Sequence, residues 1–255
     1  MTDPFAQATH AIRLDWGPVG ARATPADIAV VVDVLSFSTA VCVAVERGTV
    51  VLPYRWRGRD AERFAAEQSA VLAVGRLEAS RAGIEIPTLS PASLLTGRAV
   101  PRLVLPSPNG STIAAILSEA GGRVLAGCLR NASAVAAHLA VGLAQGRSVT
   151  ILAAGERWDR DDSLRPCVED LLGAGAIVSA LGALGYVDVS PEAALAEVAF
   201  TGTRWRLVET LTECASGIEL RDKGFGVDVD IAAALDVSST VPLLTQGAFV
   251  SADEH

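Results

Sequence analysis

An aspartate and several hydroxyl side chains follow the most apolar segment of the chain. Residues 28–35 are apolar apart from Asp33, and Ser36, Ser38 and Thr39 come directly after them. Such a run predicts a strand buried on both faces, with a helix beginning at the hydroxyl side chains. In parallel α/β sheets ligands bind at the carboxyl ends of strands, and helix N-termini attract anions. Asp33 is therefore a candidate metal ligand or general acid–base; alternatively, Asp33 and Ser36 only cap the helix.

A second candidate anion site is the turn at residues 106–112, Pro-Ser-Pro-Asn-Gly-Ser-Thr. It separates an apolar strand expected at 103–105 from a helix expected at 113–119. Proline and glycine make the turn rigid, and its N–H groups suit phosphate or sulfonate binding. The same residue types also build an ordinary turn with a helix cap. The candidate substrate-binding residues at these first two junctions are Ser36, Ser38, Thr39, Asn109, Gly110, Ser111 and Thr112.

Arg130 and Asn131 lie at a third predicted junction, between a strand at 123–126 and a helix at 132–143. A guanidinium group in this position can hold an oxyanion through two hydrogen bonds. Arg130 is therefore a candidate catalytic residue, and Asn131 is a candidate substrate-binding residue. An ordinary surface arginine near a helix start is the alternative.

Three further acids belong to the same kind of junction. Glu156 follows the strand expected at 149–153, at the start of a charged loop, and is a candidate catalytic residue. Glu169 and Asp170 occupy the first turn of a helix expected at 168–184. Carboxylates held at the mouth of a site are hard oxygen ligands that suit Mg²⁺. Acids in a first turn are also favoured by the helix dipole alone.

The elements that must position these residues alternate along the chain between strand and helix. This order predicts an α/β fold with a mostly parallel central sheet and helices on both faces. Gly173 and Gly175 are unfavourable inside a helix, which indicates close packing of 168–184 against the sheet. Further strands are expected at 10–16 and 241–244, both at sheet edges, and at 49–52 and 70–74.

The expected domain is a single one over residues 10–246, with flexible ends at 1–9 and 247–255. Residues 76–101 contain scattered prolines and little periodicity, so they are expected to form a long irregular excursion of the kind that is often functional. Asp228 and Asp230 are expected to form an acidic surface.

Composition limits the classes of protein that fit. Hydrophobic residues make up 50% of the 255 residues, but none of their runs reaches the length of a membrane span. The net charge of −8 argues against a nucleic-acid partner. Four widely spaced cysteines predict free buried thiols rather than zinc ligands or disulfides. The first ten residues lack the features of a signal peptide, so we expect a cytoplasmic location, and a homodimer is common for chains of this type.

The set of junctions resembles the 2-phosphosulfolactate phosphatase family. The matching segments keep the family's order and are VVVDVLSFST at 30–39, SPNGST at 107–112, GCLRNASAVA at 127–136, AAGE at 153–156, VEDLLGAGAI at 168–177 and the tail from 216 to 242. The resemblance implies Mg²⁺-dependent hydrolysis of (2R)-2-phospho-3-sulfolactate to 3-sulfolactate and phosphate, a step of coenzyme M synthesis. Asp33, Glu169 and Asp170 are then the candidate metal ligands, or Asp33 positions the attacking water.

Two positions depart from the family's pattern. The first motif typically runs DVLRATT, whereas Ser36 and Phe37 replace the Arg-Ala pair here. A Gly-Glu-Arg common in the family near residue 75 is Gly75-Arg76 followed by Leu77, with Glu78 displaced. These changes leave the exact substrate open.

Three other interpretations stay open. A non-catalytic binding protein for a small anionic metabolite could keep the same turns without needing the acids. A covalent aspartyl-phosphate on Asp33 is disfavoured because the chain has no DxDx[TV] signature. A cysteine-based hydrolase would need a histidine, and the chain has only His10, His138 and His255.

Overall fold

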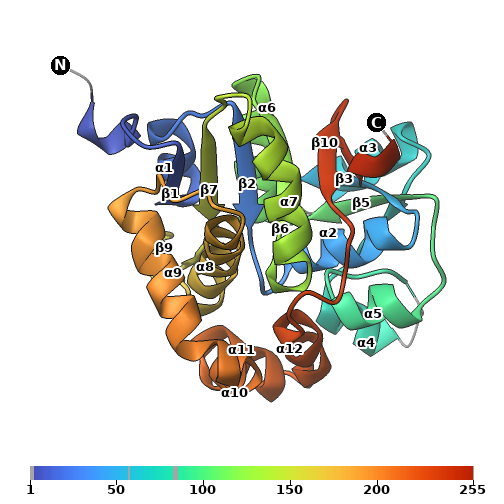
Figure 1. The fold of residues 1–255 in the computed structure, drawn as a ribbon. Helices are drawn as coiled ribbons and strands as arrows, with labels where there is room; N and C mark the ends of the chain where they lie inside the picture. The colour runs from blue at the N-terminus through green and yellow to red at the C-terminus, as the bar shows by residue number, and fades with distance from the viewer. Residues whose placement is uncertain (1–2, 57, 83–85, 255) are drawn as a thin grey trace.

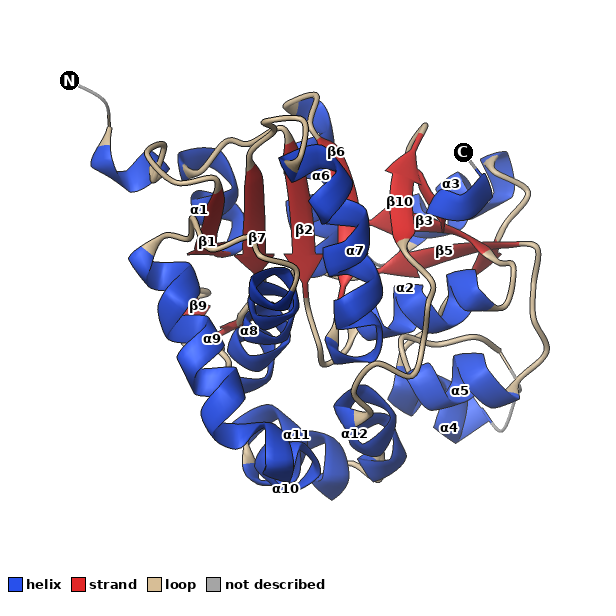
Figure 2. Ribbon diagram, in the orientation of Figure 1, coloured by secondary structure: helices blue, strands red, loops and turns tan. Residues whose placement is uncertain are grey.

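The computed structural model describes residues 3–56, 58–82 and 86–254 (Figures 1 and 2). Its large sheet contains β1 (Ile12–Trp16), β2 (Ile28–Val32), β3 (Val50–Tyr54), β4 (Val71–Leu72), β5 (Arg102–Pro106), β6 (Arg123–Gly127), β7 (Val149–Ala153), β10 (Pro242–Thr245) and β11 (Ala248–Ser251). The helices are α1 (Gly17–Ala23), α2 (Phe37–Glu46), α3 (Arg59–Glu67), α4 (Arg76–Ala82), α5 (Pro91–Thr96), α6 (Gly110–Glu119), α7 (Ala132–Leu143), α8 (Val168–Ala183), α9 (Pro191–Thr203), α10 (Leu207–Glu213), α11 (Ala215–Asp222) and α12 (Gly226–Ala233). Short β8 (Glu156–Arg157) and β9 (Leu164–Arg165) pair separately.

The sheet consists of two parallel blocks joined by a hairpin. Its strand order is β1-β7-β2-β6-β10-β11-β3-β5-β4, and every neighbouring pair is parallel except those that involve β10 or β11. The hairpin touches each block through one paired residue, Leu243 opposite Leu125 and Phe249 opposite Val51. The expected α/β fold with a mostly parallel sheet is confirmed.

The C-terminal region differs from the expectation. Residues 241–244 are expected at a sheet edge, but β10 lies in the middle of the strand order. Residues 247–255 are expected to be flexible, yet β11 completes the hairpin, and its Phe249 is fully buried. Both differences arise because β10 and β11 pair with strands some 120 to 200 positions earlier in the chain. A local sequence pattern does not indicate such distant pairing.

Helices cover both faces of the sheet, as expected. Val30 and Val32 of β2 belong to the core beneath α7 and α8, which cross the front of the sheet in Figure 1. Ala29 and Val31 face the opposite core, beneath α2 and α6. Adjacent strand residues point to opposite faces, so this all-apolar strand is buried on both sides. Within the described residues, helices are too short or too polar to cross a membrane.

Several of the remaining helices lie beyond the arrowheads of β2 and β7. Figure 2 shows α10, α11 and α12 at this end of the sheet, with α4 and α5 beside them. Residues 76–101, expected to be irregular, contain the helices α4 and α5, so that prediction is wrong for these segments. Ser90 caps α5 by accepting the Ser93 N–H, and Pro91 occupies its first turn, which explains a helix in a proline-containing segment.

Two glycines of α8 permit close packing on two sides. A Cβ on Gly173 would lie 2.6 Å from Val34 Cγ2, which agrees with the expected approach of α8 to the sheet. A Cβ on Gly175 would lie 2.0 Å from the carbonyl oxygen of Ala196, so this glycine serves the contact with α9 instead. Each glycine therefore fixes one neighbour of α8.

We expect Gly175→Ala to lower the free energy of unfolding by about 2–3 kcal/mol, because the new methyl group must displace the backbone of α9. Gly202→Ala is the matched control, since a Cβ there meets nothing within 4 Å. Its stability should stay within about 1 kcal/mol of wild type. Urea unfolding measures both, and equal stability of the two variants would contradict the packing role.

Candidate active site

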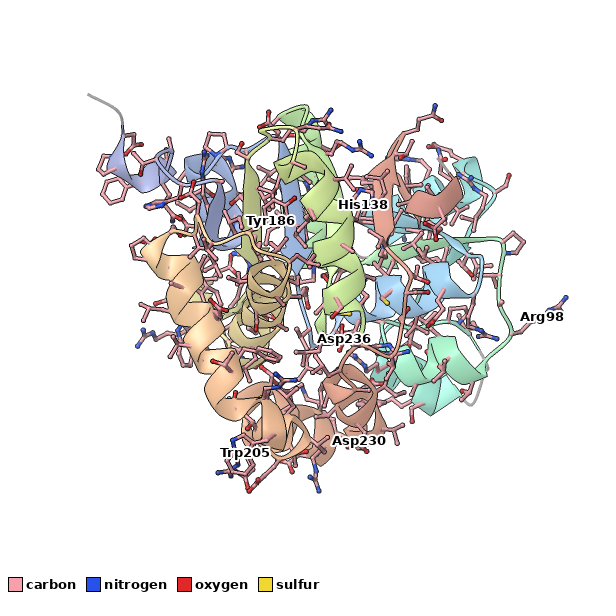
Figure 3. All side chains as sticks on the ribbon, in the orientation of Figure 1. Arg98, His138, Tyr186, Trp205, Asp230 and Asp236 are labelled. Carbon is pink, nitrogen blue, oxygen red and sulfur yellow. The ribbon has the colours of Figure 1, made fainter. Side chains whose placement is uncertain are left out.

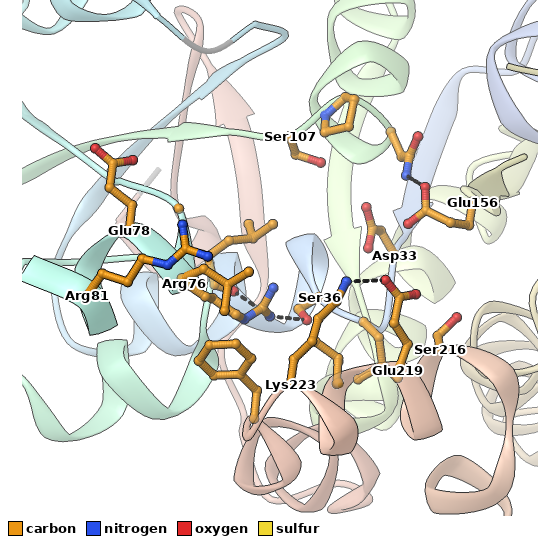
Figure 4. Close-up of a pocket in the computed structure, with 18 residues that line it drawn as sticks. Asp33, Ser36, Arg76, Glu78, Arg81, Ser107, Glu156, Ser216, Glu219 and Lys223 are labelled. Atoms are coloured by element: carbon orange, nitrogen blue, oxygen red, sulfur yellow. Dashed lines mark hydrogen bonds and ion pairs between the residues drawn. The ribbon is translucent and has the colours of Figure 1, made fainter. Parts of the chain in front are cut away.

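A pocket of about 800 Å³ lies where the carboxyl ends of several strands meet (Figure 4). One wall is formed by the segments that follow β2, β5 and β7. The opposite wall comes from α4 and α11. The lining residues are Asp33, Leu35, Ser36, Gly75, Arg76, Leu77, Glu78, Arg81, Leu89, Ser107, Pro108, Asn109, Glu156, Ser216, Glu219, Leu220, Lys223 and Phe225.

Asp33 is held at the inner end of this pocket by backbone groups. Its Oδ1 accepts the Phe37 N–H at 3.0 Å, and its Oδ2 accepts the Gly110 N–H at 3.1 Å. The side chain is only 7% exposed, and burial raises its pKa to about 7 despite these hydrogen bonds, with further increases from the charges of Glu156 and Glu169. Asp33 therefore acts as the predicted helix-start acid and also faces the pocket.

Asp170 lies behind Asp33 and joins two strand ends. Its Oδ1 accepts the Val34 N–H at 2.7 Å, and its Oδ2 accepts the Gly155 N–H at 2.8 Å. Burial raises the pKa of Asp170 well above its ordinary value, and the charges of Asp33 and Glu169 add to that increase. Asp170 thus supports the pocket from outside its lining.

Glu156 and Glu169 complete a cluster of four carboxyl groups. Glu156 lines the pocket, where its Oε1 accepts the Asn109 side-chain amide at 2.8 Å. Glu169 is buried away from the lining, and its Oε2 accepts the Cys214 thiol at 3.3 Å. Among the described residues, none of the four carboxyl groups takes part in an ion pair. No described cationic side chain therefore lies within ion-pair distance of the cluster.

Several predicted substrate-binding hydroxyls instead stabilise the strand ends. Ser38 donates to the Val31 carbonyl at 2.8 Å and Thr39 to the Val34 carbonyl at 2.8 Å. Ser111 donates to the Leu105 carbonyl at 3.3 Å. Gly110 contributes its N–H to Asp33, and Thr112 is half-buried outside the lining. Of the predicted substrate-binding set, Ser36 and Asn109 line the pocket.

Arg130 and Asn131 are directed elsewhere. Arg130 Nη2 lies 3.5 Å from Glu46 Oε2, and its Nη1 donates to the Ile231 carbonyl at 3.3 Å. Asn131 accepts the Cys128 N–H and donates to the Thr240 carbonyl. Neither lines the pocket, because the short 3₁₀ turn that carries them directs both side chains toward α2, α12 and the segment before β10.

Three cationic residues of the pocket are not among those predicted from the sequence: Arg76, Arg81 and Lys223. Arg76 Nη2 donates to Ser36 Oγ at 2.6 Å, so a guanidinium lies beside the serine that replaces the arginine of the resembled motif. The departure from the resembled pattern at Gly75-Arg76, shortly after β4, was the available signal. No pattern in the sequence indicates that Lys223 belongs to the pocket.

Three further points concern the cysteines, two of the acids and a histidine. All four cysteines are free and buried, as predicted. Asp228, expected on an acidic surface, is 1% exposed, whereas Asp230 on the same helix is exposed (Figure 3). His138 lies half-buried on α7, outside the pocket lining (Figure 3).

The carboxylate cluster supplies hard oxygen donors, although no group of three or more His, Cys, Asp or Glu in the described ranges is already arranged around a metal position. Asp33 and Glu156 are the two cluster members that line the pocket. Mg²⁺ commonly uses one or two protein carboxylates and completes its shell with water and substrate oxygens. The residues present fit an ion held in this way, which would also compensate the cluster's charge.

Comparison with known proteins identifies the family. A family model described as 2-phosphosulpholactate phosphatase matches residues 19–247. A "Probable 2-phosphosulfolactate phosphatase" of Deinococcus radiodurans is 31% identical over 227 residues, which cover 87% of this chain and 89% of the relative. A protein of the same description from Thermus thermophilus is 30% identical over 238 residues, covering 91% and 94%.

These matches place the α/β fold and its pocket in the class of phosphoric monoester hydrolases. One wall of the pocket, formed by the segments that follow β2, β5 and β7, carries Asp33 and Glu156 and is called the acidic wall below. The aligned region includes all three strands and these segments. The chain belongs to the 2-phosphosulfolactate phosphatase family.

The raised pKa of Asp33 predicts a pH-dependent effect of its replacement. The folded protein keeps this proton up to about pH 7, whereas the unfolded chain releases it near the ordinary value of 3.8. The folded state thus binds more protons in this window, and stability falls as pH rises through it. We expect Asp33→Asn to gain stability relative to wild type between pH 4 and 7, by on the order of 2–4 kcal/mol.

Urea unfolding at several pH values, without Mg²⁺, measures this difference. Asp230→Asn is the matched control, since that exposed acid should leave the pH profile unchanged. A constant stability difference between wild type and Asp33→Asn across the window would contradict the assignment.

Proposed function

We propose that this protein hydrolyses the phosphoester bond of (2R)-2-phospho-3-sulfolactate in a Mg²⁺-dependent reaction, releasing 3-sulfolactate and phosphate. The supporting observation is the family match over residues 19–247, together with the carboxyl groups of Asp33 and Glu156 in the pocket lining. The same proposal assigns the reaction to coenzyme M synthesis in the cytoplasm.

Asp33 and Glu156 would hold the ion, because they are the members of the cluster that face the pocket. Mg²⁺ bound there would polarise the phosphoryl oxygens and lower the pKa of the attacking water. Glu169 and Asp170, the other predicted ligands, would act indirectly, since neither of them lines the pocket.

In the alternative assignment, Asp33 leaves the ion to Glu156 and acts as the general base. In hydrolysis, the oxygen of water bonds to phosphorus, the bond from phosphorus to the ester oxygen breaks, and the proton of water moves to a base. The leaving alkoxide takes up a proton, which the protonated base or solvent water can supply. An ionised Asp33 carboxylate can accept that proton. Its backbone hydrogen bonds fix its orientation before substrate binds, so little reorganisation is required.

Asn109 and Ser36 would orient the phosphoryl group. Asn109 is itself fixed by Glu156, while Ser36 is fixed by Arg76. Hydrogen bonds to the phosphoryl oxygens from such preorganised groups stabilise the charge in the transition state.

The test is phosphate release from 2-phospho-3-sulfolactate and a panel of related 2-phospho acids, with Mg²⁺ and with EDTA. We expect wild-type turnover that EDTA abolishes, and a loss of about 10²-fold or more in kcat for Asp33→Asn, the range of a general base. Asp230→Asn should retain wild-type kcat. Mg²⁺ alone should also raise the Tm of wild type, and Asp33→Asn should lose that shift.

Absence of phosphate release by folded wild-type protein across the panel would overturn the proposal. Binding of these anions without turnover would then favour a binding protein on the same fold. Full activity of Asp33→Asn would instead remove Asp33 from the reaction.

A further inference from the structure

A second cavity, of about 610 Å³, lies beside the active-site pocket. Its lining comes mainly from α2, α4 and α5, from the segments that flank α5, and from Leu103 of β5. Arg76 and Phe225 are the only described residues that border both cavities. Asp33 and Glu156 do not border the second cavity, so it is separate from the acidic wall.

Arg47 joins two walls of this cavity. It follows the last residue of α2, and its Nη1 donates to the carbonyl oxygens of Leu94 and Gly97, the latter at 2.8 Å. These carbonyls belong to the C-terminal end of α5. The guanidinium group therefore fixes α2 against this end of α5.

Asp228 of α12 joins the other end of α5 to α4. Its Oδ1 accepts the Ser90 hydroxyl at 2.5 Å and the Ala92 N–H at 3.0 Å, and its Oδ2 accepts the Nε–H of Arg76 at 2.8 Å. The Asp228 side chain is 1% exposed, so these contacts are buried. Polar contacts thus fix the walls at both ends of α5, and the space between them is preformed.

Apolar side chains border most of this space. They are Ala44, Ala79, Leu94, Val100, Leu103 and Phe225. The two alanines leave room on α2 and α4 that larger side chains would fill. Protein interiors are normally close-packed, because an unfilled apolar cavity loses the contacts between its walls. A preformed cavity of this size and lining is typical of a site for a small ligand.

The charged residues that border the cavity are all cationic. They are Arg47, Arg76 and Arg98, and the described lining contains no Asp or Glu. Asp228 offsets the charge of Arg76, but Arg47 and Arg98 form no ion pair with a described carboxylate. Arg47 is half-buried, whereas Arg98 is exposed at the surface (Figure 3). The whole chain has a net charge of −8, so this positive charge is a local feature, and it favours an anionic ligand.

We propose that the second cavity binds a small amphipathic carboxylate, a molecule with an apolar chain or ring and one anionic end. The apolar part packs against Ala79, Leu94 and Leu103. The carboxylate is held by Arg47 and Arg98, the two guanidinium groups without a described carboxylate partner. This inference does not depend on the proposed phosphatase reaction, because no residue of the acidic wall takes part in it.

Isothermal titration calorimetry on the full chain tests this inference, with octanoate as the probe and octan-1-ol as its uncharged counterpart. We expect one saturable site for octanoate. Octan-1-ol should bind about tenfold or more weakly, because it lacks the charge that the arginines hold. Ala79→Phe places a ring in the cavity from α4, and it should weaken octanoate binding by about tenfold or more, with a folded thermal transition retained.

Ala66→Phe is the matched control, because Ala66 is exposed on α3, outside both linings. It should bind octanoate as wild type does. Arg98→Gln is a second test, at an exposed position where folding is not at risk. It should weaken octanoate binding by about threefold and leave octan-1-ol binding unchanged. Arg63→Gln, exposed on α3, is its control.

Absence of saturable octanoate binding to wild type would overturn the inference, as would equal affinity for octanoate and octan-1-ol, or equal binding by Ala79→Phe and Ala66→Phe. Arg81→Gln separates the two cavities, since Arg81 lines the active-site pocket alone. This variant should bind octanoate as wild type does, and a loss of binding would place octanoate in the active-site pocket and overturn the inference. None of these measurements uses phosphate release, so failure of the phosphatase proposal would leave their interpretation unchanged.

Discussion

The pocket depends on a buried carboxylate that bridges two strand ends. Asp170 begins α8 and accepts one N–H from Val34, beyond β2, and one from Gly155, beyond β7. Each of these backbone groups is adjacent to a pocket residue, Asp33 in one case and Glu156 in the other. One helix-start acid therefore sets the separation of the two carboxylates that face the pocket, and it does so without lining the pocket itself.

This arrangement buries several carboxyl groups together where folding alone would not favour them. Burial and mutual repulsion raise the pKa of both Asp33 and Asp170, although each accepts two backbone N–H groups. Structural acids are usually compensated by a cation, whereas pKa values perturbed by clustering are common at functional sites. The nearby hydroxyls of Ser38, Thr39 and Ser111 bind strand-end carbonyls, which leaves the carboxylates as the exposed chemistry of this wall.

Sequence was informative where position along a strand decides position in space. Asp33, Asn109 and Glu156 follow different strands, and the parallel arrangement brings them to one edge. The sequence was uninformative where the direction of a side chain, or pairing between distant segments, determines whether a residue reaches the pocket or where a strand lies in the sheet. Arg130 follows its strand in the same way, but a 3₁₀ turn directs it toward Glu46. The central place of β10 and β11, and the arrival of Lys223 in the pocket lining, depend on contacts across most of the chain, which no local period encodes.

The two walls also differ in how firmly they are built. The acidic wall is held by backbone hydrogen bonds at the ends of buried strands, so its geometry changes little with the identity of surface residues. The opposite wall consists of helices α4 and α11, which are held by side-chain contacts. Arg76 joins α4 to Asp228 of α12, and Arg165 of β9 donates to Ser216 of α11. Substitutions on the helical wall can therefore alter which anion is recognised while the carboxylates keep their positions. Ser36 replaces the arginine of the family's first motif, and Arg76 supplies a guanidinium beside it from α4. This exchange is consistent with a pocket in which the carboxylates stay fixed while the residues that recognise the anion vary.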